Sequence, residues 1–98
     1  MTINKTQNGT SLVIELEGRL EALTAPELEQ ELKGCLDGIT ELTYDFQNLD
    51  YVSSAGLRIL LSAQKKMSQQ GSMKVINVNE LVMEVFNCTG FTDILTIE

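Results

Sequence analysis

The stretch Tyr51-Val52-Ser53-Ser54-Ala55-Gly56-Leu57-Arg58-Ile59-Leu60-Leu61 joins two patterns of apolar residues, and this joint decides the fold. Ahead of it, residues 42–46 alternate apolar and polar side chains, which is typical of a half-buried strand. Beyond it, the apolar residues follow the spacing of one helix face, at Leu57, Leu60, Leu61 and Met67. The stretch therefore predicts a strand that leads into a helix, with Ser53 or Ser54 at the N-cap.

Residues before the joint predict a hairpin. Asn8-Gly9 is a turn signal between two candidate strands at residues 2–7 and 11–17. The second of these strands alternates leucine and isoleucine with glutamate, and Gly18 is expected to end it or to form a bulge.

A first helix is predicted to start at Thr24-Ala25-Pro26-Glu27, with Thr24 as its cap. Pro26 suits the first turn, and Glu27 complements the positive end of the helix dipole. Asp37-Gly38 is expected to close this helix, whose apolar face comprises Leu28, Leu32, Cys35 and Leu36.

Residues after the joint repeat the alternation of strand and helix. Residues 69–72 indicate a break, and residues 73–78 are short and β-branched like a strand. Asn79 is expected to cap a helix that runs to about Asn87 and ends at Thr89-Gly90, with an apolar face of Leu81, Val82, Val85 and Phe86. Residues 91–97 predict a last short helix or an edge strand.

This order of elements predicts an α/β fold: a mixed open sheet of four to five strands, which starts with the hairpin and is packed with helices. At 98 residues, the chain is expected to form a single domain over residues 1–98. In such sheets the functional edge lies beyond the carboxyl ends of the strands. Ser53 and Ser54 are predicted to lie at that edge.

Composition excludes several kinds of function. A formal charge of −7 disfavours nucleic acid and anionic membrane surfaces, and the absence of histidine removes imidazole catalysis and histidine-ligated metals. Cys35 and Cys88 share no metal-binding spacing, and we interpret both as reduced, partly buried small apolar residues. We expect neither an enzyme nor a cofactor or metal site. With no spanning segment or secretory signal, a soluble cytoplasmic protein without membrane insertion is predicted.

Two segments resemble the STAS domain of the bacterial anti-sigma factor antagonist family. Residues 17–28, EGRLEALTAPEL, are similar to that family's segment between an early strand and the first helix. Residues 49–58, LDYVSSAGLR, are similar to its phosphorylation loop. Two spaced motifs in the family's order are more specific than either motif alone, and they predict a STAS-like domain.

The resemblance implies partner switching. In the family, the unphosphorylated antagonist binds an anti-sigma factor that is also a serine kinase, and so releases the sigma factor. The kinase phosphorylates the serine two residues before the loop glycine, here Ser54 before Gly56, and a PP2C-type phosphatase reverses this. One common form of the motif has aspartate where Ser53 stands here. Ser53 is therefore an alternative phosphoacceptor.

Several residues near the joint have two possible roles, in binding a partner or in stabilising the fold. The alternative to partner binding is a purely structural role: Ser53 and Ser54 would cap the helix, Gly56 would allow close packing, and Thr24 would cap the first helix. Arg58 and Ile59 are expected to point outward, where an exposed isoleucine would suit docking. The predicted partner-binding set is Thr24, Asp50, Ser53, Ser54, Gly56, Arg58 and Ile59.

Two other functions stay open. A STAS domain can also be a subunit of a membrane transport assembly, which co-purification with an ABC ATPase rather than a kinase would reveal. A hydrolase that uses Ser54 as its nucleophile is disfavoured, because no histidine base exists and neither Lys65 nor Lys66 is evidently placed as a substitute.

Overall fold

A five-stranded sheet forms the centre of the protein, and the computed structural model describes residues 1–98. The strands are β1 (Thr2–Asn8), β2 (Ser11–Leu20), β3 (Glu41–Val52), β4 (Ser72–Ile76) and β5 (Thr96–Ile97). They lie in the sheet in chain order; β1 and β2 are antiparallel, and every other neighbouring pair is parallel. The predicted α/β fold with a mixed sheet is confirmed.

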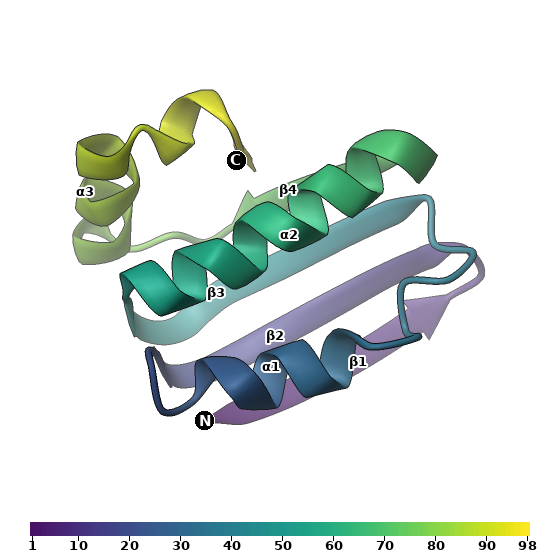
Figure 1. Ribbon diagram of the computed structural model, residues 1–98, viewed down its shortest axis with the longest axis horizontal. Coiled ribbons are helices and arrows are strands. Elements are labelled where there is room, and N and C mark those ends of the chain that lie inside the picture. The colour runs from purple at the N-terminus through teal and green to yellow at the C-terminus, as the bar shows by residue number, and fades with distance from the viewer.

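Three helices link the parallel strands: α1 (Ala25–Leu32), α2 (Ser54–Gln70) and α3 (Glu80–Thr89). The helices α1 and α2 lie side by side on one face of the sheet (Figure 1), whereas α3 packs against β3. A 3-10 turn, η1 (Phe91–Asp93), precedes β5, so the last segment forms both of the elements considered for it. None of the helices is both long enough and apolar enough to cross a membrane.

The strand β3 has 12 residues, seven more than the strand predicted over residues 42–46. Its buried residues alternate from Leu42 to Phe46 and then change period, so that Leu49 and Val52 are also buried. The register with β2 shifts at two places, beside Glu15/Glu17 and Gly18/Arg19. A bulge changes which face a side chain takes. The simple alternation therefore stops at Phe46 although the strand continues. The extra residue at each shift belongs to β3, and β2 runs on to Leu20, so the prediction that Gly18 ends or bulges the second strand is wrong.

The helix α1 is shorter than predicted, and the prediction that it ends at Asp37-Gly38 is wrong. It stops at Leu32, and turns follow over residues 33–38. Gly34 takes a φ of +80°, a left-handed value that a continuing right-handed helix cannot contain. The apolar residues Cys35 and Leu36 still pack against or within the core, but from a turn rather than from a helix face.

The helix α3 follows the sequence prediction closely. The side chain of Asn79 accepts a hydrogen bond of 2.8 Å from the N–H of Val82, and Gly90 ends the helix in the left-handed conformation. Val82 and Phe86 are buried as expected. The placement of Leu81 on the buried face is wrong, because its side chain is 51% exposed.

Candidate functional site

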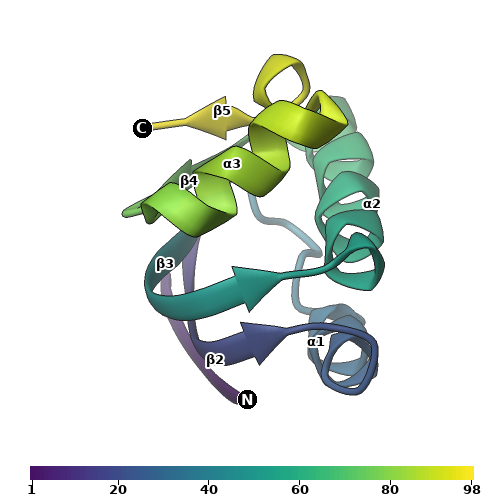
Figure 2. The same cartoon turned by 90° about the vertical axis from the view of Figure 1, so that its left-hand side faces the viewer.

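The predicted joint lies at one edge of the sheet. Figure 2 shows the loops that lead from β2 into α1 and from β3 into α2 side by side at this edge. The N–H of Ser53 donates a hydrogen bond of 2.8 Å to the carbonyl of Leu20, which ties the two loops together. The two sequence segments that predicted the family therefore meet in space.

The two serines of the joint have different environments. Ser53 takes the N-cap position of α2 with an extended backbone, but its hydroxyl makes no cap hydrogen bond, so that part of the cap prediction is wrong. The Ser53 Oγ atom is covered and has no hydrogen-bond partner. Ser54 is the first residue of α2, and it is exposed. Only the Ser54 side chain is presented at the surface.

Gly56 holds α2 close to the ends of β2 and β3. A Cβ atom at this position would lie 2.6 Å from Leu20 Cγ and 2.9 Å from Val52 Cγ2, closer than real Cβ atoms approach. Gly56 is itself buried, so it offers no surface to a partner. Its role is packing, and it drops out of the predicted partner-binding set.

The side chain of Thr24 braces the β2–α1 loop instead of capping α1. Its hydroxyl accepts a hydrogen bond of 2.9 Å from the N–H of Glu21 and donates one of 2.6 Å to the carbonyl of Arg19. It makes no side-chain bond to the helix, because its own backbone is already helical at φ −103° and ψ −22°. Thr24 takes the predicted N-cap position of α1, but the predicted cap hydrogen bond is absent, and the hydroxyl fixes the loop beside Ser53 instead.

This braced loop presents Leu23, a residue that the sequence analysis did not select. Its side chain is 85% exposed, the highest value among the exposed large apolar residues. The signal was available: Leu23 belongs neither to the alternation of β2 nor to the apolar face of α1. Single exposed apolar residues are common on protein surfaces, so Leu23 is notable here for its position beside the joint.

Charged residues precede and follow Ser54 in the chain. Asp50 and Arg58 are both exposed, four residues before and after it, and Arg58 has no carboxylate within salt-bridge distance. Arg19 pairs with Glu21 at 3.2 Å and lies 4.9 Å from the centre of the Tyr51 ring. The edge therefore combines one apolar side chain, a free hydroxyl and charges of both signs.

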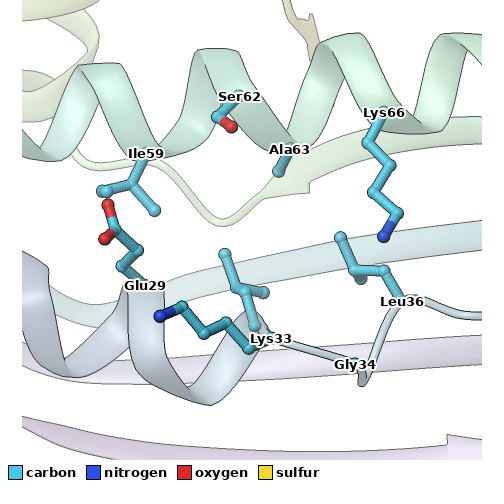
Figure 3. Close-up of a pocket in the computed structure, with 9 residues that line it drawn as sticks. Glu29, Lys33, Gly34, Leu36, Ile59, Ser62, Ala63 and Lys66 are labelled. Carbon is cyan, nitrogen blue, oxygen red and sulfur yellow. The ribbon is translucent and has the colours of Figure 1, made fainter.

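Ile59 points inward, which contradicts its predicted outward orientation. Its side chain is only 9% exposed, because the buried face of α2 runs through residues 56, 57, 59, 60, 63 and 67. Leu61, expected in the core, is half-buried instead. Ile59 borders an open groove of about 380 Å³ between α1 and α2, together with Ala63, Lys33 and Lys66 (Figure 3). This groove contains none of the other predicted site residues.

The two cysteines differ in exposure. Burial raises the pKa of the Cys35 thiol, so this residue keeps its proton at neutral pH. Cys88 is exposed on α3, so the expectation that it is partly buried is wrong. Neither cysteine belongs to the edge around Ser54.

The family follows from the comparison with known proteins. Residues 3–96 match the sequence model of the family described as Mlab, STAS domain. The chain belongs to the STAS domain family. The predicted resemblance is thereby confirmed, and the two motifs that carried it are the two loops at the edge of this STAS domain.

Curated relatives of this STAS domain have related names. The chain is 36% identical over 88 residues to BtrV of Bordetella bronchiseptica, named as an anti-sigma factor antagonist, and covers 76% of that protein and 88% of its own length. It is 26% identical over 98 residues to the anti-sigma-B factor antagonist of Bacillus subtilis, covering 90% of that protein and 99% of its own length.

Solved structures share the fold. The anti-sigma factor antagonist SpoIIAA in its unphosphorylated form superposes with a TM-score of 0.84 at 17% identity, covering 99% of this chain and 88% of that chain. The Bacillus cell fate determinant SpoIIAA in its phosphorylated form gives a TM-score of 0.76 at 16% identity, covering 99% and 91%. At these identities the likeness establishes the fold of the STAS domain.

Proposed function

We propose that this STAS domain is an anti-sigma factor antagonist whose binding is switched off by phosphorylation at Ser54. The unphosphorylated form binds an anti-sigma factor that is also a serine kinase, and the sigma factor is released. The kinase transfers the γ-phosphoryl group of ATP to Ser54 Oγ, which loses its proton, with ADP as the other product. A PP2C-type phosphatase hydrolyses the phosphoserine and restores the free hydroxyl.

The exposure of Ser54 carries this proposal. Its hydroxyl is at the surface, whereas the Ser53 Oγ atom is covered, so a kinase reaches Ser54 without moving the start of α2. The relatives named as anti-sigma factor antagonists support the antagonist function, and SpoIIAA, a protein of the same fold, has a phosphorylated form. Ser53 remains the alternative acceptor, and its modification requires its hydroxyl to be uncovered first.

The proposed partner surface surrounds Ser54. It consists of Leu23 on the braced loop, together with Asp50, Ser54 and Arg58, all of which are exposed. Thr24 contributes by holding the loop rather than by direct contact. Leu23 is suited to insert into an apolar pocket of the partner, because an exposed leucine on an ordered loop costs little conformational entropy on binding.

The effect of the phosphate is electrostatic. A phosphoserine adds about −1.5 to −2 charges at neutral pH. On a chain with a formal charge of −7, and four residues from Asp50, this charge repels an interface that was formed with a neutral hydroxyl. The phosphate at the first residue of α2 does not disturb the core, because Ser54 is exposed. Phosphorylation therefore changes binding and leaves the fold intact.

Two substitutions test the switch. We expect Ser54→Ala to bind the purified anti-sigma factor as the wild type does, and Ser54→Asp to bind at least about tenfold more weakly. Ser68→Asp is the matched control, because it adds the same charge at an exposed serine near the other end of α2. Isothermal titration measures all three. Equal affinity of Ser54→Asp and the wild type contradicts the proposal.

The phosphoacceptor is identified separately. Incubation with the candidate kinase and ATP, followed by mass spectrometry of peptides, is expected to place the phosphate on Ser54 in the wild type and to find none in Ser54→Ala. A phosphate on Ser53 alone contradicts the site. Co-purification with an ABC ATPase in place of a small ATP-binding kinase would instead support the transport-assembly function.

A further inference from the structure

The helix α2 has an unusual distribution of charge. Its 17 residues include Arg58, Lys65 and Lys66 and no aspartate or glutamate, although the whole chain has 14 acidic residues against seven basic ones. A cation on this helix therefore has no acidic neighbour one turn away to pair with. The three cations are all exposed.

Arg58 is the cation nearest in sequence to the proposed phosphoacceptor. It follows Ser54 by four residues, which on an α-helix is one turn and about 6 Å along the axis. The Cα–Cβ bond of a helical residue tilts toward the helix N-terminus, so the guanidinium group of Arg58 can reach the turn that contains Ser54. Both side chains are exposed, and neither packs in the core.

Four of the other cations are paired with carboxylates, and Lys65 lies far along the same helix. Lys5, Arg19, Lys66 and Lys74 each have a carboxylate within 4.0 Å, whereas Arg58 has none. Arg19, which lies on the neighbouring loop, is additionally stacked over the ring of Tyr51. Lys65 is three turns further along α2, about 16 Å from Ser54 along the axis. Arg58 is therefore the one free cation placed one turn from Ser54.

We propose that Arg58 is the intramolecular counter-ion of phosphorylated Ser54. This inference rests on the proposed function, since it concerns the phosphorylated state of the same serine. An arginine guanidinium matches two phosphate oxygens at once and keeps its charge at every relevant pH. In the unphosphorylated protein Arg58 is free to contact the partner. In the phosphorylated protein it is held by the phosphate, so one modification both adds repulsive charge and removes a contact.

The negative groups near the pair oppose it only weakly. Asp50 is exposed at the end of β3, and Glu21 on the β2–α1 loop already pairs with Arg19. Charges exposed to water interact weakly with one another unless they are in contact. Along α2, Arg58 is the unpaired cation nearest in sequence to a phosphate on Ser54.

The test uses full-length protein with phosphoserine incorporated at position 54 during translation, so it does not depend on any kinase. The readout is a phosphorus NMR titration of the phosphate's second ionisation. We expect Arg58→Gln to raise that pKa by about 0.3–0.6 unit relative to the unsubstituted phosphoprotein. Arg58→Lys should restore part of the difference. Lys65→Gln, which removes an exposed cation three turns away, should leave the pKa unchanged.

A second readout observes Arg58 itself. In proton–nitrogen NMR spectra the side-chain Nε–H signal of Arg58 is expected to shift between the unmodified and the phosphorylated protein. An unmoved Arg58 signal together with equal phosphate pKa values in the wild type and Arg58→Gln would overturn the inference. Failure of the kinase to modify Ser54 would count against the proposed function instead, and the NMR result would stand.

Discussion

The helices α2 and α3 of this protein each follow a parallel strand, and they begin differently. The start of α3 is fixed by side-chain hydrogen bonds: Asn79 accepts from the N–H of Val82 at 2.8 Å and donates to the carbonyl of Leu49 at 2.8 Å. The start of α2 has a serine at the same N-cap position, but the hydroxyl of Ser53 makes no hydrogen bond. What holds α2 in place is packing at Gly56.

This difference indicates that the start of α3 has a structural role, whereas the start of α2 leaves a side chain available for function. At α3 the polar side chain is used to satisfy the helix and the neighbouring strand, so any change there affects the fold. At α2 the fold depends on Gly56, and the nearby Ser54 is exposed. A residue without a structural role can be modified without unfolding the domain. The predictions below test this division.

The largest effect is expected from Gly56→Val. The added side chain would overlap Leu20 and Val52, both fully buried, so we expect the free energy of unfolding to fall by about 3 kcal/mol. Ser62→Val is the matched control at an exposed position of the same helix, and it should cost only a few tenths, about 0.5 kcal/mol. Urea denaturation measures both. Equal losses would show that packing at Gly56 does not hold α2.

A smaller loss is expected from Asn79→Ala. The substitution removes the cap of α3 and the bond to Leu49, and we expect the free energy of unfolding to fall by about 2 kcal/mol. The same urea titration measures it, with binding of the anti-sigma factor as the second readout. Binding by the folded variant should be unchanged. A weakened affinity without a loss of stability would contradict the structural assignment of this joint.

Leu23→Ser is expected to weaken partner binding while stability is kept. An exposed leucine gains burial only in the complex, so its loss should lower the affinity about tenfold, or about 1.4 kcal/mol. Leu81→Ser is the matched control, because Leu81 is the exposed leucine in the first turn of α3. Titration calorimetry compares the two variants. A larger loss of affinity in Leu81→Ser would indicate that the partner binds at α3 rather than around Leu23.

The smallest effect is expected from Ser53→Ala. An N-cap serine ordinarily contributes about 1 kcal/mol through its hydrogen bond. Here no such bond exists, so the free energy of unfolding should change by less than about 0.5 kcal/mol. Thermal and urea denaturation are sensitive enough to separate these values. A loss near 1 kcal/mol would mean that Ser53 caps α2 in solution.

Much of the fold was predictable because local patterns were strong. The alternation in β2, the turn at its start and the cap at Asn79 depend on residues close together in the chain, and each appears where predicted. The prediction failed where the pattern was interrupted. The bulges in β3 interrupt the alternation of apolar and polar residues, so the second half of this strand was not predicted. The helix α1 ends before Gly34 although the apolar spacing continues beyond it.

The candidate site was predictable in part. Both loops and the pair Ser53-Ser54 were found from the sequence, but the orientation of Ile59 was not. A stretch in which Leu57, Ile59, Leu60 and Leu61 are all apolar allows several helix faces, and only the position of the sheet selects one. Leu23 was missed because an apolar residue in a loop has no periodic pattern to identify it.

The sequence by itself determined the order of strands and helices, the family, and the absence of histidine chemistry, because these depend on residue identity and short-range spacing. The tertiary structure decided which of two adjacent serines is exposed. That difference arises because Leu20, Val52 and Gly56 bring β2, β3 and the first turn of α2 together, which covers the hydroxyl of Ser53 and leaves Ser54 at the surface. Residue spacing cannot predict which serine is exposed, because that exposure depends on contacts between elements that are far apart in the chain.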